Sequence, residues 1–373
     1  MNGVTGRMGT NQHLMRSMVE IIRDGGVWLN NNDRIMPDPV LIGRNIDKLE
    51  ALSRQTGIKN YSVNLDDFLK DERYPVYFDA QTTEKRAESI NKAIDYGKHI
   101  YCEKPVAGSV KEAIKLFRQC KRAGLKNGVV QDKLWLPGLI RLNQLIRNGF
   151  IGKVLSVKAD FGYWVFEGFS IAPQRPSWNY KKENQGGIIL DMFCHWNYIL
   201  ENLFGKVLAV SCMGSTLVPK RVDENGKEYM ATADDIAFGS FLLENNIIAQ
   251  INSSWCTRVR RDDLLTIQVD GSRGSAVAGL RECYCQDYNS TPRAVWNPDI
   301  PQSIDFNDSW KQVSGEAEYP NAFRAQWELF LKHVVIGEPF PWTLLEGAKG
   351  VQLAEKAMES WKKKRWIHIP ELH

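Results

Sequence analysis

The stretch YCEKPVAGS, residues 101–109, begins in hydrophobic, strand-like sequence and places Lys104 between an acid and a proline. A second stretch, GGIILDMFCHW at 186–196, spaces Asp191 and His195 four residues apart. Residues four apart lie on the same face of a helix, so this spacing predicts a carboxylate beside an imidazole. An amine, a carboxylate and an imidazole together are the groups that proton transfer to or from a hydroxyl requires.

Around the first stretch, short apolar runs alternate with amphipathic segments of helical spacing. Strands alternating with helices of this length predict βαβ units and a parallel sheet, which is the core of a Rossmann domain. The expected strands are 39–43, 74–80, 99–103 and 127–132, and the expected helices are 13–25, 46–57, 85–99 and 111–124.

The loop GVTGRMG, residues 3–9, has three glycines spaced three apart ahead of a helix. Glycines allow a backbone to approach a pyrophosphate, and a helix N-terminus offers unpaired N–H groups and a positive dipole end. The sequence therefore predicts a dinucleotide site at Gly3, Gly6, Arg7, Met8 and Gly9. A glycine-rich turn alone is a common feature and weak evidence for such a site.

Only Met1 and Asn2 precede the first glycine, although such a loop normally follows a strand of about five or six residues. We therefore expect the first strand to be missing or truncated, and we favour a misassigned start over a truncated chain. Comparing this chain with a version extended upstream would test that expectation, because equal folding and cofactor binding by both would contradict it.

The acid that normally holds the adenosine ribose is absent from its usual place, about 20 residues further on. Residues 25–39, GGVWLNNNDRIMPDP, have the composition of an inserted loop. The next strand ends at Gly43, followed by Arg44 and Asn45, and a guanidinium there suits a 2′-phosphate. The cofactor prediction is NAD or NADP, with a lean to NADP, unless Arg44 is only a solvated loop residue.

The second half of the chain is rich in strand-like segments and lacks the alternation of strands and helices seen in the first third. A run of strands after βαβ units predicts a separate antiparallel layer. The expected strands are 154–166, a pair within 236–255 that turns at 244–246, and a pair within 264–279, and long amphipathic helices are expected at 323–335 and 346–363.

Composition narrows the class of protein. Hydrophobic residues make up 43% of the 373 residues, charged residues 25%, and the formal net charge is +4 with the positive charge scattered, so nucleic-acid binding is a poor first guess. No apolar run is long enough to span a membrane. Seven cysteines, an odd number, argue against a closed disulfide framework and favour a cytoplasmic protein with reduced thiols. Cys283 and Cys285 are too close for a CxxC pair, and no metal site is expected.

Tryptophan usage is a further signal. Of the 12 tryptophans, Trp164, Trp178, Trp196 and Trp255 lie in polar company near the candidate site segments. Most tryptophans serve cores, but an indole face also stacks on the C–H face of a sugar ring. Four of them near the site segments favour a polyhydroxylated ring as the ligand.

Taken together, the two stretches resemble the Gfo/Idh/MocA family, which includes glucose–fructose oxidoreductase and inositol dehydrogenase. The EKP motif is Glu103-Lys104-Pro105, and the second motif is Gly186-Gly187, Asp191 and His195. The pair of motifs is quite specific, and the resemblance covers nearly the whole chain.

The resemblance implies a Rossmann domain followed by a large, open, mostly antiparallel sheet with helices on one face. The division expected is a Rossmann NAD(P)-binding domain at 1–130, a substrate-binding and oligomerisation α+β domain at 131–345, and a C-terminal helix and tail at 346–373 that pack back toward the first domain. Many members form dimers or tetramers through the exposed sheet face, so a homodimer or homotetramer is expected here, with no nucleic-acid or membrane partner.

For chemistry, we expect hydride transfer between nicotinamide and a secondary hydroxyl of a sugar, glycoside or cyclitol. His195 is the natural base, because its ordinary pKa lies near neutral pH. Lys104 would stabilise the developing negative charge on the reacting oxygen. Asp191 would orient the imidazole or bind a neighbouring hydroxyl. Whether the lysine or the histidine takes the proton is left open, and the bland alternative is an ordinary helix pair and a surface lysine.

Further contacts with cofactor and substrate are expected, and some of them involve the catalytic residues themselves. Arg175 and Arg258 are weaker candidates for binding a carboxylate or phosphate, and Asp234 and Asp235 fit a turn or cap better than a site. Expected cofactor contacts beyond the glycine loop are Arg44, Asn45, Thr82, Thr83, Glu103 and Lys104, and expected substrate contacts are Lys133, Trp164, Trp178, Tyr180, Asp191 and His195.

Two other functions stay open on the sequence. One is hydrolysis of glycosides through transient oxidation by a bound cofactor, which would cleave glycosides without net production of NAD(P)H. The other is a non-catalytic regulator that binds a dinucleotide, against which the retention of Lys104, Asp191 and His195 together argues.

Overall fold

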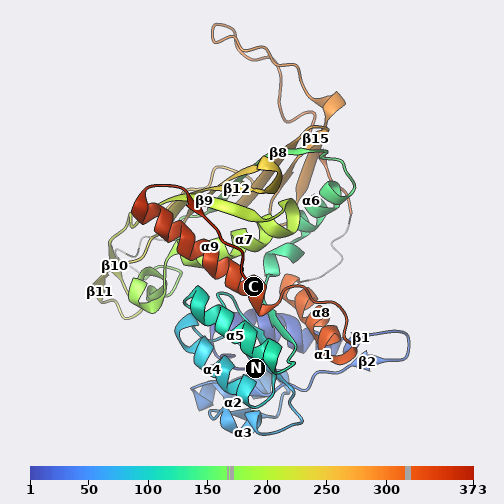
Figure 1. Cartoon of the computed structure of the whole chain (residues 1–373), viewed down its shortest axis with the longest axis vertical. Helices are drawn as coiled ribbons and strands as arrows, with labels where there is room; N and C mark the ends of the chain where they lie inside the picture. The colour runs from blue at the N-terminus through green and yellow to red at the C-terminus, as the bar shows by residue number, and fades with distance from the viewer. Residues whose placement is uncertain (166–167, 169–171, 316–320) are drawn as a thin grey trace.

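The computed structural model describes residues 1–165, 168, 172–315 and 321–373 (Figure 1). A smaller layered domain built from the N-terminal third lies at one end, and a large sheet lies at the other. Among the described residues, no helix combines the length and the hydropathy needed to cross a membrane.

The N-terminal domain has the parallel sheet that the sequence predicts. Asn2 pairs in parallel with Ile42 on one side and Asp79 on the other, so this single residue joins two groups of strands into one sheet. The Met1 ammonium donates to the Val40 carbonyl over 2.8 Å. The strands are β3 (Leu41–Ile42), β4 (Tyr61–Ser62), β5 (Val76–Asp79), β6 (His99–Cys102) and β7 (Asn127–Val129), in the order β4-β3-Asn2-β5-β6-β7.

Helices cover this sheet, and their ends follow local chemistry. Asn45 caps α2 by accepting from the Lys48 N–H, and Gly57, at φ +75°, ends the same helix. Ser109 caps α5 by accepting from the Glu112 N–H. The helices are η1 (Gly9–Val19, a π-helix), α1 (Glu20–Arg23), α2 (Ile46–Thr56), α3 (Asp66–Leu69), α4 (Thr83–Asp95) and α5 (Val110–Arg122).

The expected inserted loop at 25–39 contains a short antiparallel hairpin, β1 (Val27–Trp28) and β2 (Arg34–Ile35), beside α1 and α8 (Figure 1). The hairpin turns through an asparagine-rich segment in which the Asn30 side chain accepts from two backbone N–H groups, those of Asn32 and Asp33. This local hydrogen bonding is what asparagine favours in turns.

The C-terminal domain is built on one nine-stranded sheet, and only the β13–β8 pair is parallel. The prediction of a large, mostly antiparallel sheet is confirmed, although residue 166 at the end of the first expected strand lies outside the described residues. In sheet order the strands are β17 (Lys311–Gln312), β16 (Cys283–Asp287), β15 (Gly274–Ala278), β14 (Leu265–Gly271), β8 (Val154–Gly162), β13 (Ile248–Ser254), β12 (Ile236–Leu243), β9 (Val207–Ser215) and β18 (Ile367–His368).

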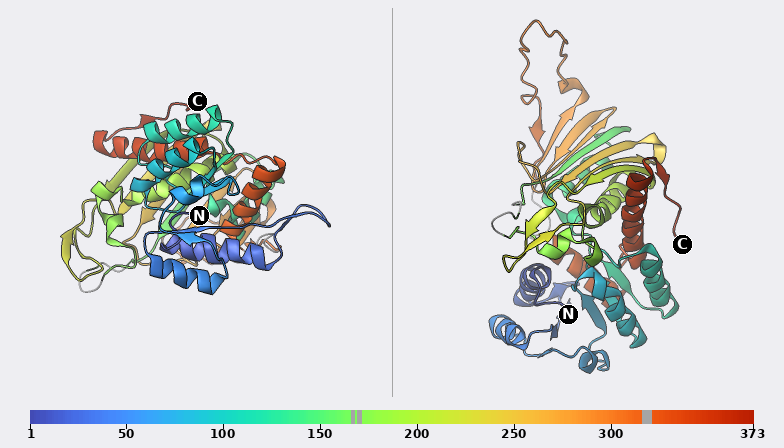
Figure 2. Two further views of the ribbon diagram at one scale, coloured as in Figure 1. Left: turned by 90° about the horizontal axis from the view of Figure 1, so that it is seen from below. Right: turned by 90° about the vertical axis from the view of Figure 1, so that its left-hand side faces the viewer.

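Helices cover one face of this sheet, and the opposite face is open (Figures 1 and 2). Phe193 and Trp196 of α7 are buried with Phe241 of β12 in the core between the two layers. The main helices here are α6 (Pro137–Arg147), α7 (Ile188–Phe204) and α9 (Leu344–Lys363). The short elements are η2 (Asp132–Trp135), η3 (Ser177–Tyr180), η4 (Lys182–Asn184), η5 (Glu244–Asn246), η6 (Tyr288–Ser290) and the hairpin β10 (Lys220–Val222) and β11 (Glu228–Met230).

The return of the chain to the first domain begins earlier than expected. Helix α8 (Ala322–Ile336), assigned from sequence to the second domain, packs against η1. The Trp327 indole donates to His13 Nδ1 over 3.0 Å, and the Gln326 amide bonds the backbone of Val129 and Gln131. Helix α9 then packs on both α5 and α7, so two helices lock the domains together.

Candidate active site

The EKP turn follows β6 and is held to the first helix of the chain. Glu103 is buried, with Oε1 2.7 Å from His13 Nε2 and Oε2 accepting the Lys104 N–H over 3.1 Å. Arg86 of α4 donates to the Pro105 carbonyl from the other side. Glu103 was expected to contact the cofactor, but both of its carboxylate oxygens are engaged within the protein. Its observed contacts fix the direction in which Lys104 leaves the sheet.

Lys104 points at the first turns of α7, where Asp191 receives it. Lys104 Nζ lies 2.5 Å from Asp191 Oδ1 and 3.1 Å from the Asp191 carbonyl oxygen. Arg175 Nη2 lies 2.6 Å from the other carboxylate oxygen, Oδ2. One carboxylate is thus shared by two cations from segments distant in sequence, and the exposed fractions of the three side chains are 15–23%.

The charge balance at this carboxylate favours its ionised form. Burial alone raises the pKa of Asp191, but the charges of Lys104 and Arg175, with a smaller contribution from Lys133, outweigh burial and hold the pKa well below its usual range. The Lys104 ammonium is therefore paired with a permanent negative charge rather than with a carboxylic acid.

His195 lies one turn further along α7 and is 4% exposed. Its Nδ1 is 2.6 Å from Tyr198 Oη, and its Nε2 is 3.2 Å from Lys133 Nζ. The sequence suggested that Asp191 would orient this imidazole or bind a neighbouring hydroxyl. The first of these differs from the structure, because Lys104 and Arg175 occupy both Asp191 oxygens and Tyr198 occupies Nδ1.

Burial and positive neighbours act in the same direction on the imidazole. Burial, then the charges of Lys104, Lys133 and Arg175, lower the pKa of His195 well below its ordinary value of 6.5. Burial likewise lowers the pKa of Lys133, which Asp132 partly opposes. The imidazole is therefore neutral at neutral pH and has a lone pair available to accept a proton.

The start of α7 is fixed by a buried acid. Asp234 accepts the Ile189 N–H on Oδ2 over 2.7 Å, and its carbonyl accepts the Ile188 N–H. This contact fits the expectation of a turn or cap rather than a site residue. The neighbouring Asp235 forms an ion pair with Arg221. Because Asp234 holds the first turn, Asp191 and His195 occupy fixed positions facing the N-terminal domain.

The glycine loop fits a dinucleotide by its backbone packing. A Cβ at Gly3, at φ +85°, would lie 2.7 Å from the Ala80 carbonyl carbon, and one at Gly9 would collide with the Gly3 carbonyl oxygen. Gly6 and Arg7 are exposed immediately before η1 begins. An exposed turn leading into the free N–H groups of a helix is the arrangement that receives a pyrophosphate.

The expected cofactor residues all follow strands of the same sheet. Arg44 and Asn45 come after β3, and Thr82 and Thr83 come after β5. Arg44 and Thr82 are exposed, whereas Asn45 is engaged as the cap of α2 and Thr83 is buried. The glycine loop follows Asn2, Lys104 follows β6 and Lys133 follows β7. Parallel strands bring all of these carboxyl ends to one edge of the sheet, where ligands of open α/β sheets bind.

Of the four tryptophans near the site segments, two are buried in the core, as most tryptophans are. Trp196 is fully buried and donates to Ser253 Oγ over 2.9 Å, and Trp255 is 2% exposed. Trp178 and Trp164 are partly exposed, and the Arg258 guanidinium lies 3.9 Å from the Trp164 ring. Only these two are accessible enough to meet a ligand.

Tyr180 also departs from its expected role as a substrate contact. It is fully buried, with the Arg221 guanidinium 3.9 Å from its ring and the Trp255 ring 5.4 Å away. The Arg175 guanidinium lies 4.3 Å from the other buried ring, Trp255. The aromatic side chains behind the site therefore support Arg175 rather than line a ligand surface.

Sequence reasoning underrated one residue and missed two. Arg175 was only a weak candidate, yet it shares Asp191 with Lys104. Tyr198 and Asp132 were not considered, although both lie next to His195 in space. A signal for each was present, because Tyr198 follows His195 by three residues on the same helix and Asp132 precedes Lys133.

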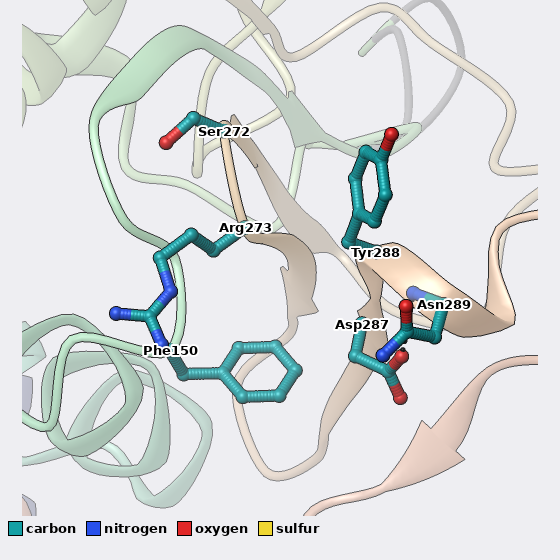
Figure 3. Close-up of a pocket in the computed structure, with 6 residues that line it drawn as sticks. All are labelled: Phe150, Ser272, Arg273, Asp287, Tyr288 and Asn289. Atoms are coloured by element: carbon teal, nitrogen blue, oxygen red, sulfur yellow. Dashed lines mark hydrogen bonds between the residues drawn. The ribbon is translucent and has the colours of Figure 1, made fainter.

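A surface pocket of the described residues lies away from this cluster (Figure 3). It has a volume of about 580 Å³ and sits at the β16 end of the sheet, lined by Phe150, Ser272, Arg273, Asp287, Tyr288 and Asn289. None of these residues contacts the Lys104–Asp191–Arg175 cluster or His195 in the described hydrogen bonds and ion pairs.

Fold and site together define a dinucleotide-dependent oxidoreductase, and comparison with known proteins places it more narrowly. Residues 29–130 match the oxidoreductase family with an NAD-binding Rossmann fold, and residues 139–277 match the GFO/IDH/MocA C-terminal domain. A D-xylose dehydrogenase of Paenarthrobacter nicotinovorans is 49% identical over 376 residues, covering 100% of this chain and 97% of that protein. The chain belongs to the Gfo/Idh/MocA family, as the two motifs predicted.

More distant relatives agree on the fold. A levoglucosan dehydrogenase of Pseudarthrobacter phenanthrenivorans is 23% identical over 357 residues, which cover 89% of this chain and 90% of that protein. A solved levoglucosan dehydrogenase in complex with NADH and levoglucosan matches with a TM-score of 0.80 at 19% identity, covering 98% of each chain. The predicted Rossmann domain with a large second sheet is confirmed, and so is a nicotinamide dinucleotide as cofactor.

Proposed function

We propose that this protein is a dehydrogenase that removes hydride from a hydroxyl-bearing carbon of a free sugar, with an aldopentose such as D-xylose as the first candidate. The observation that carries the proposal is that Lys104, from a distant segment, pairs with Asp191 one helical turn before His195, at the carboxyl edge of the dinucleotide-binding sheet. The full-length similarity to a D-xylose dehydrogenase supports the choice of substrate class.

A nicotinamide held at this edge of the sheet would supply the hydride acceptor, and the protein's own side chains handle the proton and the charge. The neutral His195 imidazole accepts the hydroxyl proton at Nε2, which faces Lys133 rather than the helix interior. The Lys104 ammonium donates to the reacting oxygen and stabilises the negative charge that develops there. Its other contact, with Asp191, holds it in place before the substrate arrives.

Asp191 and Arg175 also supply recognition. A sugar ring presents several hydroxyls that need partners, and a carboxylate with a guanidinium offers an acceptor and donors side by side. The partly exposed Trp164 and Trp178 provide apolar surfaces for the ring. Substrate hydroxyls beside the reacting one would replace part of the Arg175–Asp191 contact rather than remain unpaired.

For the cofactor, we propose that Arg44 gives a preference for NADP over NAD. Arg44 is exposed just after β3, where the adenosine ribose is held in such folds. A guanidinium there can bind a 2′-phosphate in a bidentate fashion.

The experiment is a panel of aldopentoses, aldohexoses, cyclitols and glycosides, each assayed with NAD and NADP by absorbance of the reduced nicotinamide. We expect the fastest reduction with an aldopentose, and we expect Arg44→Gln to lower kcat/KM with NADP roughly tenfold while leaving NAD nearly unchanged. Glycoside cleavage without net cofactor reduction would contradict the proposal in favour of hydrolysis by transient oxidation. Dinucleotide binding without turnover of any substrate would favour a regulator.

We further propose a homo-oligomer formed through the open face of the nine-stranded sheet. This face exposes Met213, Phe238 and Ile248, and Phe238 pairs directly with Met213 across β12 and β9. Apolar side chains clustered on an uncovered sheet are typical of interaction surfaces. Light scattering that gives a monomer at micromolar concentration would contradict this proposal.

A cytoplasmic location is also part of the proposal. All seven cysteines are unpaired, and five of them are buried. Free buried thiols suit a reducing compartment. Cell fractionation that recovers the protein with periplasmic or secreted markers would contradict it.

A further inference from the structure

Tyr198 stands at the centre of a small buried network that the proposed reaction has not yet used. Its Oη is 2.6 Å from His195 Nδ1, 3.4 Å from Asp132 Oδ1 and 3.3 Å from the Lys133 backbone nitrogen. Tyr198 is 4% exposed, and burial together with the Asp132 charge raises the pKa of its phenol well above the ordinary value. The hydroxyl therefore keeps its proton, and that one proton can be donated to one neighbour only.

Counting donors and acceptors shows where that proton goes. The Lys133 N–H can only donate to Tyr198 Oη, and the Asp132 carboxylate can only accept. If Tyr198 donates to Asp132, its oxygen is free to accept from His195 Nδ1–H. Every contact then joins a donor to an acceptor, and the bare Nε2 of His195 faces the Lys133 ammonium at 3.2 Å.

The opposite assignment fails at two contacts. If Tyr198 donates to Nδ1, the imidazole proton moves to Nε2 and points at the Lys133 ammonium, which has only donors. Asp132 Oδ1 then also loses the Tyr198 hydrogen bond in a site where an unmatched polar group is costly. The described contacts therefore favour one tautomer strongly over the other.

We propose that Tyr198 and Asp132 form a positioning pair that holds His195 in the Nδ1–H tautomer, with Nε2 ready to accept the substrate proton. This inference rests on the proposed role of His195 as the proton acceptor. Neither Tyr198 nor Asp132 needs to touch the substrate. Both act through the imidazole.

The proton balance is simple. When the substrate is oxidised, its O–H bond breaks, a new Nε2–H bond forms on His195, and the hydride leaves separately to the nicotinamide. The imidazolium keeps its Nδ1–H bond to Tyr198, and Tyr198 keeps its own bond to Asp132. The Asp132 charge thereby stabilises the imidazolium through the phenol, against the positive charges of Lys104, Lys133 and Arg175, which lower the pKa of the ring.

Lys133 has a defined part in the resting state. Its ammonium occupies the Nε2 lone pair of His195 and lies 3.6 Å from the second Asp132 oxygen, Oδ2. A substrate hydroxyl can take its place at Nε2 while Lys133 stays paired with Asp132. The base is thus held by one hydrogen bond on each side before substrate binds.

The test measures the tautomer directly. Protein with ¹⁵N-labelled histidine is examined by NMR in the resting state, and the His195 signals are assigned by their loss in His195→Gln. We expect Nδ1–H in the unaltered protein and a shift toward Nε2–H or a mixture in Tyr198→Phe, which removes the acceptor at Nδ1. In the same variant we expect kcat to fall roughly 10- to 100-fold with little change in KM.

The matched control is Tyr101→Phe. Tyr101 is also fully buried, but its hydroxyl has no hydrogen-bond partner among the described residues, so its loss should leave both the tautomer and kcat unchanged. Asp132→Asn keeps the shape of the side chain, removes its charge, and is expected to lower kcat several-fold. Circular dichroism of all variants checks that they are folded.

Three results would overturn the proposal: an Nε2–H tautomer in the unaltered protein, an unchanged tautomer in Tyr198→Phe, or full turnover in Asp132→Asn. Failure of the underlying function looks different. Normal turnover of His195→Gln would show that His195 does not accept the substrate proton. The tautomer measurement does not depend on activity, so its result would still test the positioning pair.

Discussion

Two aspartates, one in each domain, face cations in opposite circumstances. Asp79 ends β5 in the N-terminal domain and pairs with Arg86 at 3.1 Å, with side chains 0% and 3% exposed. Asp191 in the second domain pairs with Lys104 and Arg175, and its side chain is 23% exposed. Burial raises the pKa of Asp79 despite Arg86, whereas the cations prevail over burial and lower the pKa of Asp191.

The difference separates a structural ion pair from one that we propose to take part in the reaction. Arg86 also donates hydrogen bonds to the carbonyls of Gln81 and Pro105, so this ion pair connects β5 to the EKP turn. Lys104 and Arg175 instead hold a carboxylate at a partly exposed position, where a ligand can share it. A fully buried ion pair can only hold the backbone in place, whereas a shared and partly exposed carboxylate is suited to position cations for the proposed chemistry.

The largest effect is expected for Lys104, which pairs with the partly exposed carboxylate of Asp191. Lys104→Met removes the group that, in the proposed reaction, stabilises charge on the reacting oxygen, and it should lower kcat by about 10²- to 10³-fold. Cofactor binding, measured by fluorescence titration of the reduced dinucleotide, should stay nearly unchanged, because the glycine loop and Arg44 remain.

The control for that variant is Lys356→Met, which removes a lysine paired with Glu359 on α9. It should keep full turnover. A Lys104→Met protein with turnover equal to this control would show that the shared carboxylate does not position a catalytic cation.

The second-largest effect is expected for the buried ion pair of Arg86 and Asp79. Arg86→Met leaves the Asp79 carboxylate buried without its cation and should lower the free energy of unfolding by about 3–5 kcal/mol. Chemical denaturation followed by circular dichroism measures the change. Lys206→Met breaks a pair with Glu371 that is more than half exposed and should leave the unfolding midpoint almost where it is. Equal unfolding midpoints for Arg86→Met and Lys206→Met would contradict the prediction that the buried ion pair stabilises the fold more than the exposed one.

The smallest effect is a shift in pH dependence. Because His195 has a pKa lowered well below 6.5, it can accept a proton in mildly acidic solution, and the acid limb of the kcat/KM profile should lie below that value. Lys133→Gln removes one of the charges that lower the pKa, so the pKa should rise and the acid limb should move to higher pH. A limb that stays in place or moves to lower pH in this variant would contradict the assignment of that limb to His195.

Much of the fold was predictable because it depends on local patterns. Helix α2 was expected at 46–57 and spans Ile46–Thr56, ended by the predicted Gly57. The turn expected at 244–246 separates β12 and β13. The return of α8 to the N-terminal domain was not predictable, because its partners, such as His13 for Trp327, lie some 300 residues away in sequence.

The candidate site was predictable in its members more than in their contacts. Spacing alone placed Asp191 and His195 on one helix face, and both lie in α7. Spacing could not show that Arg175 and Lys104 would take the Asp191 oxygens, or that Tyr198 would take His195 Nδ1. Side chains from other segments of the chain decide which of these neighbouring polar groups form hydrogen bonds with one another.

By itself, the sequence determined the class of this protein: two motifs, an alternating first third and a strand-rich second half suffice for a Rossmann oxidoreductase with a second sheet. Only the tertiary structure decided the charge state and orientation of the site. Burial and the meeting of Lys104, Lys133 and Arg175 around α7 set those pKa values, and such fields depend on distances in space rather than along the chain.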